Sequence, residues 1–161
     1  MREHVKAFEG NEYIKMAVDM LHEAPNEEEG TKALFILLKV LAKRMAEGGE
    51  VLTPMVDKNH VMEHLDLSAL DKGDTFSLDE DLRMIIDKIM DKDGNIFVPL
   101  YTDEEEVNRG QTTNLRVNLS IRTILEEAVS YEKSCGLVIN PFGESVIIPK
   151  EGIRMVLDMV K

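Results

Sequence analysis

The chain has 161 residues, of which 43% are apolar and 31% charged, and this composition is typical of a folded domain rather than a disordered segment. Its net charge of −12, from 19 basic and 31 acidic residues, argues against nucleic acid and membrane surfaces as partners, because phosphate binding requires clustered Lys and Arg. The single cysteine, Cys135, permits no internal disulfide and favours a reducing compartment, so we expect a cytoplasmic location.

The first predicted helix begins at Asn11, a residue type that commonly caps helices. Apolar residues then recur at helical spacing through Ile14, Val18 and Leu21. One face of this helix should therefore be buried.

The second predicted helix begins at Asn26, whose side chain can cap the amide of Glu29, and it stops at Gly48–Gly49. Its apolar residues cover a wide arc, so we expect it to be buried on more than one side, either within the monomer or against a second copy. The residues of this arc are Leu34, Phe35, Leu38, Leu41 and Met45. Packing within the monomer is the expected outcome, with any oligomer weak or absent.

After residue 50 the pattern of the sequence changes from long helices to short, strand-like segments. The segment 51–56 is apolar and contains Pro54, which predicts an edge strand or the end of a strand. Residues 83–90 are compatible with either a helix or a strand. The turn residues Asp91–Gly94 precede a strand-like segment over 96–101, so we favour a hairpin there.

The last third alternates short helices and strands. Thr102 with Glu105 predicts the start of an acidic helix that ends at Gly110. A strand over 115–119 should lead into a helix capped by Ser120. A closing hairpin is predicted between residues 137–139 and 146–148, and the final helix should begin near Pro149.

These elements predict an α+β fold, with a largely antiparallel or mixed sheet covered by helices and preceded by an N-terminal helix pair. We divide the chain into the helix pair, residues 1–49, packed on a main domain, residues 50–161. The polar start of the chain is unlike a signal peptide, and its longest apolar run is too short to span a bilayer.

Two segments of the main domain resemble one protein family. Residues 96–105, IFVPLYTDEE, are similar to a family stretch with Pro followed by Phe-Thr, although Tyr101 stands where Phe is more common. Residues 136–144, GLVINPFGE, are similar to its Gly-hydrophobic-Val-Ile-Asn-Pro hairpin. The chain thus resembles the bacterial SseB-like proteins, named for enhanced serine sensitivity, over residues 50–161. The resemblance implies an α+β domain but no catalytic residues, because the family has no established activity.

A candidate metal site lies at His60 and His64. With Glu63 they match the His-x-x-Glu-His pattern of inverted zinc metallopeptidases, in which two histidines on one helical face bind zinc. The flanking residues leave room for barely two helical turns, and such enzymes are larger and use a further carboxylate. We therefore expect no metal and no cofactor, and we rank a metal-dependent hydrolase third among the functions.

The loop 140–144 is the candidate for partner binding. Phe142 occupies a turn where a small polar residue would suffice, so it either folds back onto the sheet or contacts a partner. If the strands before this loop and before Thr102 are neighbours, acidic residues from both loops surround an apolar anchor. The predicted site comprises Phe142, Asn140, Glu144, Asp103 and Glu104.

An apolar anchor with an acidic rim suits a basic peptide or protein segment. We therefore expect a non-enzymatic protein-binding or regulatory domain. The alternative is a protein that responds to a small molecule or an amino acid, which the link of the family to serine sensitivity suggests.

The candidate zinc site gives a direct prediction. Protein purified under mild conditions should contain no stoichiometric zinc, because two histidines on a short polar segment supply too few ligands. Elemental analysis measures this. One equivalent of zinc that disappears in His64→Ala would contradict the expectation.

Overall fold

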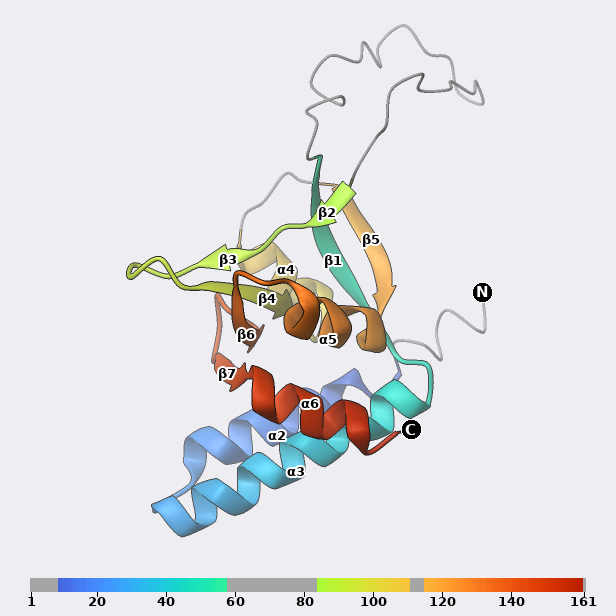
Figure 1. Ribbon diagram of the computed structural model, residues 1–161. Helices are drawn as coiled ribbons and strands as arrows, with labels where there is room; N and C mark the ends of the chain where they lie inside the picture. Colours follow the sequence, from blue (N-terminus) through green and yellow to red (C-terminus); the bar gives the residue numbers. More distant parts are fainter. Residues whose placement is uncertain (1–8, 58–83, 111–114, 161) are drawn as a thin grey trace, which may run out of the picture.

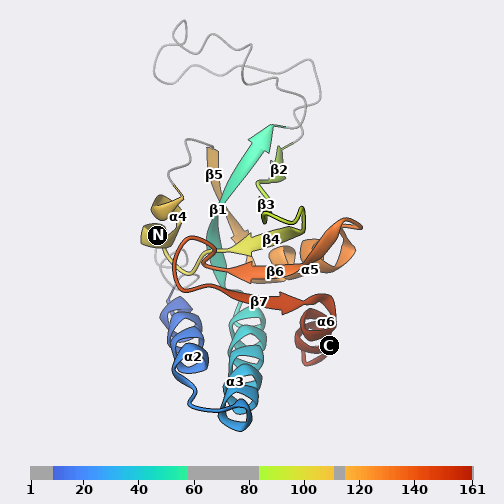
Figure 2. The ribbon, with the colours of Figure 1, turned by 90° about the vertical axis from the view of Figure 1, so that its left-hand side faces the viewer.

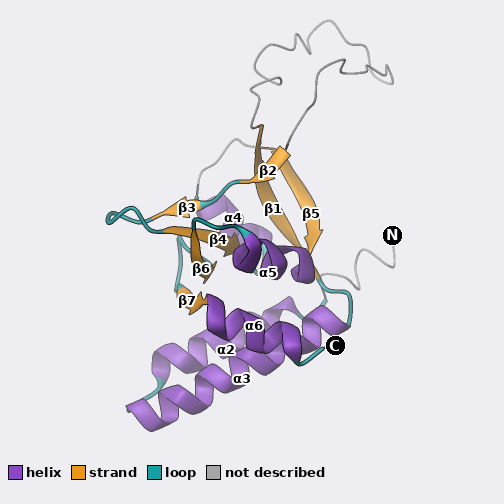
Figure 3. Ribbon diagram, in the orientation of Figure 1, coloured by secondary structure: helices purple, strands orange, loops and turns teal. Residues whose placement is uncertain are grey.

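The computed structural model describes residues 9–57, 84–110 and 115–160 (Figure 1). The helices are α2 (Asn11–Glu23), α3 (Glu27–Ala46), α4 (Glu104–Arg109), α5 (Ile121–Ser130) and α6 (Lys150–Asp158). The strands are β1 (Glu50–Asp57), β2 (Met84–Ile86), β3 (Ile89–Met90), β4 (Ile96–Leu100), β5 (Leu115–Ser120), β6 (Ser134–Ile139) and β7 (Val146–Pro149). Figure 3 shows this α+β organisation, which confirms the predicted fold class. The segment 84–90, for which the sequence left helix and strand open, forms two short strands.

The strands form two sheets. One has the order β2-β1-β5 and the other the order β3-β4-β6-β7. Strands β4 and β6 are parallel, and the other pairings are antiparallel. Both predicted hairpins, β3–β4 and β6–β7, are present. In the first, Asp91 Oδ1 accepts hydrogen bonds from the amides of Asp93 and Asn95, each at 2.9 Å, so a turn accounts for these acidic residues.

Strand β1 corrects the expectation of an edge strand or the end of a strand, because it has neighbours on both sides and Pro54 lies within it. It pairs with β5 on one side and with β2 on the other. Pro54 is tolerated because the pairing with β2 begins only at Met55, so the missing amide of Pro54 interrupts no ladder. Its carbonyl still accepts a hydrogen bond of 3.0 Å from the amide of Asp87.

Some of the predicted helix caps are present in the structure and others are not. Asn26 accepts a hydrogen bond from the amide of Glu29 at 2.9 Å, and Ser120 caps α5, both as predicted. Asn11 is not the cap of α2, because Gly10 occupies that position with a φ of 101°. Asn11 is instead the first helical residue, and its side chain is buried.

The Asn11 side chain joins three elements. Its Oδ1 accepts hydrogen bonds from Nε and Nη2 of Arg44 in α3, at 3.1 and 3.0 Å. Its Nδ2 donates to the carbonyl of Glu50 at the start of β1, at 2.9 Å. The Arg44 guanidinium is also buried and pairs with Glu47 at 3.0 Å. This polar junction attaches the helix pair to the first strand of the main domain.

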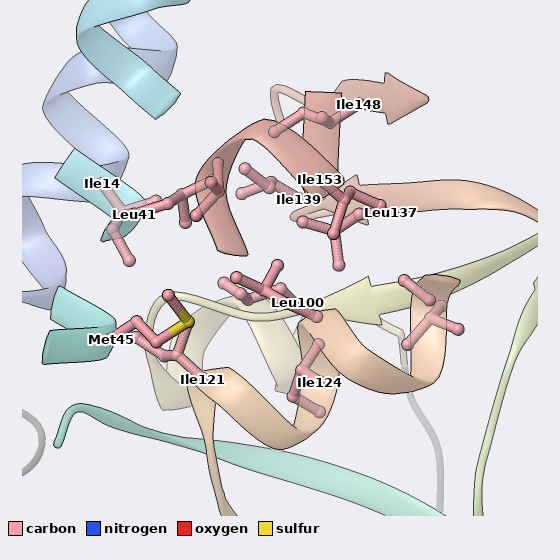
Figure 4. Close-up of a cluster of buried hydrophobic side chains, with 14 of the residues drawn as sticks. Ile14, Leu41, Met45, Leu100, Ile121, Ile124, Leu137, Ile139, Ile148 and Ile153 are labelled. Carbon is pink, nitrogen blue, oxygen red and sulfur yellow. The ribbon is translucent and has the colours of Figure 1, made fainter. Parts of the chain in front are cut away.

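A hydrophobic core connects the helix pair to the second sheet (Figure 4). Side chains from both parts of the chain meet there, and those labelled in Figure 4 are Ile14, Leu41, Met45, Leu100, Ile121, Ile124, Leu137, Ile139, Ile148 and Ile153. Helix α3 lies between α2 and α6, as Figure 2 shows, which explains its wide apolar arc. Phe35 was expected in that arc but is 46% exposed.

Replacing Arg44 tests the polar junction. Arg44→Met keeps much of the side-chain volume but leaves the buried Asn11 oxygen without its donors, so unfolding free energy should fall by about 2–3 kcal/mol. Chemical denaturation followed by circular dichroism measures the loss. The matched change Lys39→Met, at an exposed position of the same helix, should cost less than about 0.5 kcal/mol. Equal effects of the two variants would contradict a stabilising role of the junction.

Candidate functional site

The parallel pairing of β4 and β6 brings the two predicted site loops together. Leu100 is the register partner of Ile139, so both strands end at the same edge of the sheet. Asn140, directly after β6, donates its amide to the carbonyl of Leu100 at 2.9 Å. Its side-chain Oδ1 accepts from the amide of Thr102 at 3.0 Å, and its Nδ2 donates to Thr102 Oγ1 at 3.0 Å. Asn140 has a φ of 50°, a left-handed conformation that Asn tolerates better than most residues.

Helix α4 starts one residue later than predicted. Asp103, not Thr102, is the cap, and its Oδ1 accepts the amide of Glu106 at 2.9 Å. The reason is that Thr102 is already held by Asn140. The acidic first turn of α4 then projects Glu104 and Glu105 into solvent, whereas Glu106 is 3% exposed.

A cleft of about 690 Å³ lies between α2, α4 and the loop after β6. Helix α2 contributes Lys15, Val18, Asp19, His22 and Glu23, α4 contributes Glu106 and Arg109, and the loop contributes Asn140, Phe142, Gly143 and Glu144. The His22 ring also hydrogen-bonds to the carbonyl of Ser145 at 2.8 Å, which links the end of α2 to the start of β7.

Glu106 is the buried charge of this cleft. Its Oε1 accepts from Nε of Arg109 at 3.1 Å and lies 3.4 Å from Nζ of Lys15. Its Oε2 is buried and has no hydrogen-bond partner in the described part of the chain. Gly143 covers that oxygen so closely that a Cβ at position 143 would lie 2.5 Å from it. A buried carboxylate oxygen without a donor is costly, so this site favours an incoming donor.

The cations of the cleft are already paired. Lys15 contacts Asp103 at 3.3 Å as well as Glu106, and Arg109 contacts Glu105 at 3.2 Å as well as Glu106. Burial opposes the charged form of Lys15, but the hydrogen bonds and charges of Asp103 and Glu106 outweigh it, so the pKa of Lys15 is raised.

The remaining acids of the cleft are not paired in this way. Within residues 9–57, 84–110 and 115–160, no basic side chain forms an ion pair with Asp19, Glu23 or Glu144. The cleft therefore presents uncompensated negative charge.

Phe142 is both supported and accessible. Its ring stacks on Tyr101 at a centroid distance of 6.4 Å and an interplanar angle of 15°. Gly110 lies beneath it, where a Cβ would come within 2.6 Å of Cε2 of Phe142. Phe142 nevertheless remains 48% exposed, so its ring folds back onto the protein only in part, and contact with a partner stays a prediction. Burial raises the pKa of Tyr101, and the negative charge of Asp87 raises it further. The Tyr101 ring that stacks on Phe142 is therefore uncharged.

Of the five predicted site residues, Phe142, Asn140 and Glu144 line the cleft. Asp103 borders it through its ion pair with Lys15, whereas Glu104 does not line it. The sequence missed Lys15, because nothing in α2 indicates that it faces a loop 88 residues away. It also missed Glu106, because one buried acid in a run of three has no local signature.

The candidate zinc residues His60 and His64 lie outside the described residues. In the part of the chain that is described, no group of three or more His, Cys, Asp or Glu side chains is arranged to hold a metal ion. The described helices include none with the length and apolar character needed to cross a membrane.

Comparison with protein-family models, with curated proteins and with solved structures finds no match to this chain. The resemblance to SseB-like proteins therefore rests on residues 96–105 and 136–144 and stays a prediction.

Two substitutions separate the hydrogen bonds of Asn140 from its left-handed backbone conformation. Asn140→Ala leaves the buried Thr102 amide without its acceptor and places Ala in a left-handed conformation, so stability should fall by about 2–4 kcal/mol. Asn140→Gly loses the same hydrogen bonds but relieves the backbone strain, and should therefore be less destabilising. Chemical denaturation compares them. If neither variant lowers the unfolding free energy, Asn140 does not hold the two loops together.

Proposed function

We propose that this protein is a non-enzymatic binding domain of a bacterial cytoplasm that takes a basic peptide or protein segment in the cleft between α2, α4 and the loop 140–144. The main observation behind the proposal is that the buried carboxylate of Glu106 lies in the cleft and that one of its oxygens has no hydrogen-bond donor. A Lys or Arg side chain can supply that donor.

The surroundings of Glu106 support a cationic ligand rather than an anionic one. Lys15 and Arg109 are engaged by the acids of α4, whereas Asp19, Glu23 and Glu144 have no basic partner among the described residues. An arriving anion would have to displace existing ion pairs, and an arriving cation would not. The overall charge of −12 adds a long-range attraction for basic partners.

Phe142 supplies the apolar part of the recognition. Phe142 is 48% exposed at the edge of the cleft, and its ring stacks on Tyr101. The aliphatic stem of Lys, or the plane of an Arg guanidinium, can lie on such a ring while its charged head reaches the acids. Because Gly143 covers Glu106 Oε2, full insertion of a basic head requires the loop 140–144 to move outward.

A small zwitterion such as an amino acid is the second candidate. It is favoured by the presence of both signs of charge in one cleft, since Lys15 and Arg109 border the same space as Glu106 and Glu144. The existing ion pairs of both cations make this fit poorer than that of a basic segment.

Titration calorimetry with a short capped peptide rich in Arg and Lys tests the proposal. Binding should occur, weaken with added salt, and be absent for a Glu-rich peptide of equal length. Phe142→Ala should weaken binding by about 1–3 kcal/mol, and Glu144→Gln should also weaken it, while Glu151→Gln, an exposed acid on α6, serves as the unaffected control.

Three outcomes would contradict the proposal. One is the absence of binding to the basic peptide. Another is equal binding of the basic and the Glu-rich peptides. The third is a Phe142→Ala variant that loses stability while its affinity for the peptide is unchanged, which would make Phe142 a purely structural residue. Binding of free amino acids but not of the peptide would support the second candidate instead.

A further inference from the structure

The free acceptor of the cleft and its aromatic residue lie next to each other. Oε2 of Glu106 is buried and has no hydrogen-bond partner among the described residues. Gly143, which covers this oxygen, directly follows Phe142 in the chain, and all three residues line the same cleft. A ligand group that reaches Oε2 therefore lies beside the Phe142 ring.

The other oxygen of Glu106 is already occupied. Nε of Arg109 donates to Oε1 at 3.1 Å, and Nζ of Lys15 lies 3.4 Å from it. A further donor can therefore be added only at Oε2. Because the two cations already offset much of the charge of Glu106, the geometry and hydration of the incoming donor matter more there than its charge.

The ring of Phe142 is fixed in place before any ligand arrives. It stacks on Tyr101 at a centroid distance of 6.4 Å, and Gly110 lies so close to its edge that a Cβ there would be 2.6 Å from Cε2. Phe142 is still 48% exposed, so part of its surface is open to a ligand. A side chain that is already ordered loses little conformational entropy on binding.

We propose that the cleft selects arginine over lysine, and that Phe142 together with Glu106 makes this selection. The inference rests on the proposed function, because it names the side chain that the cleft recognises in a basic segment. A guanidinium is planar, stacks on aromatic rings and carries N–H donors around its edge. One arginine can therefore lie on Phe142 and donate to Oε2 of Glu106 at the same time.

Lysine fits this pair of contacts less well. Its ammonium is a compact and strongly hydrated charge, so it loses more hydration than a guanidinium when it reaches a buried oxygen. The flexible stem of lysine can cover the ring of Phe142, but it offers no flat donor group to stack there.

The outer acids of the cleft attract both basic residues alike. Asp19, Glu23 and Glu144 line the cleft, and none of them has an ion-pair partner among the described residues. Their attraction depends on charge and is screened by salt. Added salt should therefore weaken the binding of both residues, while the preference for arginine remains.

Two capped peptides of equal length and charge test the selection, one with Arg and the other with Lys at every basic position. In titration calorimetry the Arg peptide should bind about five- to tenfold more tightly. Phe142→Leu keeps an apolar side chain but removes the ring, so the two affinities should become nearly equal. Phe35→Leu, at an aromatic residue of similar exposure on α3, should leave the preference unchanged.

Glu106→Gln tests the second contact. Lys15 and Arg109 donate at the position of Oε1, so the amide oxygen of Gln must lie there and its NH₂ group replaces the acceptor Oε2. The preference for the Arg peptide should therefore fall. Glu104→Gln removes a charge from the same helical turn outside the cleft, and should leave the ratio of the two affinities unchanged. Circular dichroism of each variant checks that its fold is retained.

The outcomes separate this inference from the proposed function. If neither peptide binds, both fail together. If the two peptides bind with equal affinity, the selection of arginine is wrong, while the cleft remains a site for basic segments. A preference that survives unchanged in both Phe142→Leu and Glu106→Gln would also overturn the inference.

Discussion

The contacts of Asn140 are the constraint on which the rest of the site depends. Parallel strands β4 and β6 end at one edge of the sheet, and Asn140 closes that edge by binding Leu100 and Thr102. Because Thr102 is held there, the cap of α4 falls on Asp103, and this register turns Glu106 inward. The carbonyl of Asn140 also accepts the amide of Gly143, at 3.0 Å, which folds the loop over Glu106 and positions Phe142 against Tyr101.

Two buried charges in the described structure serve different purposes. Arg44 is enclosed at the junction of α2, α3 and β1, and its hydrogen bonds to Asn11 and Glu47 make it part of the fold. Glu106 is equally buried, but one of its oxygens lacks a donor and it lies in a cleft. Buried charges are expensive unless they are fully paired, so an incompletely satisfied one in a cleft supports the proposal of a binding site.

Much of the fold could be predicted because its signals are local. The cap at Asn26, the cap at Ser120 and the turn at Asp91 each depend on residues a few positions apart. The predicted helix caps were wrong where residues distant in the sequence bind the expected capping residue. Arg44 donates hydrogen bonds to the Asn11 side chain, and Asn140 accepts the amide of Thr102. The site was predicted in part for the same reason. Its two loops carry visible motifs, but the contribution of Lys15 depends on how α2 packs against them.

The most direct test of the cleft as a binding site is an NMR titration of the isotopically labelled chain with an Arg- and Lys-rich peptide. If the cleft is the binding site, amide shifts should concentrate at Gly143, Phe142, Glu106 and Gly110, because these residues lie at or under the contact. The amides of α6 should stay unchanged. Shifts confined to surfaces remote from the loop 140–144, or no shifts at peptide concentrations near 1 mM, would contradict the proposed site.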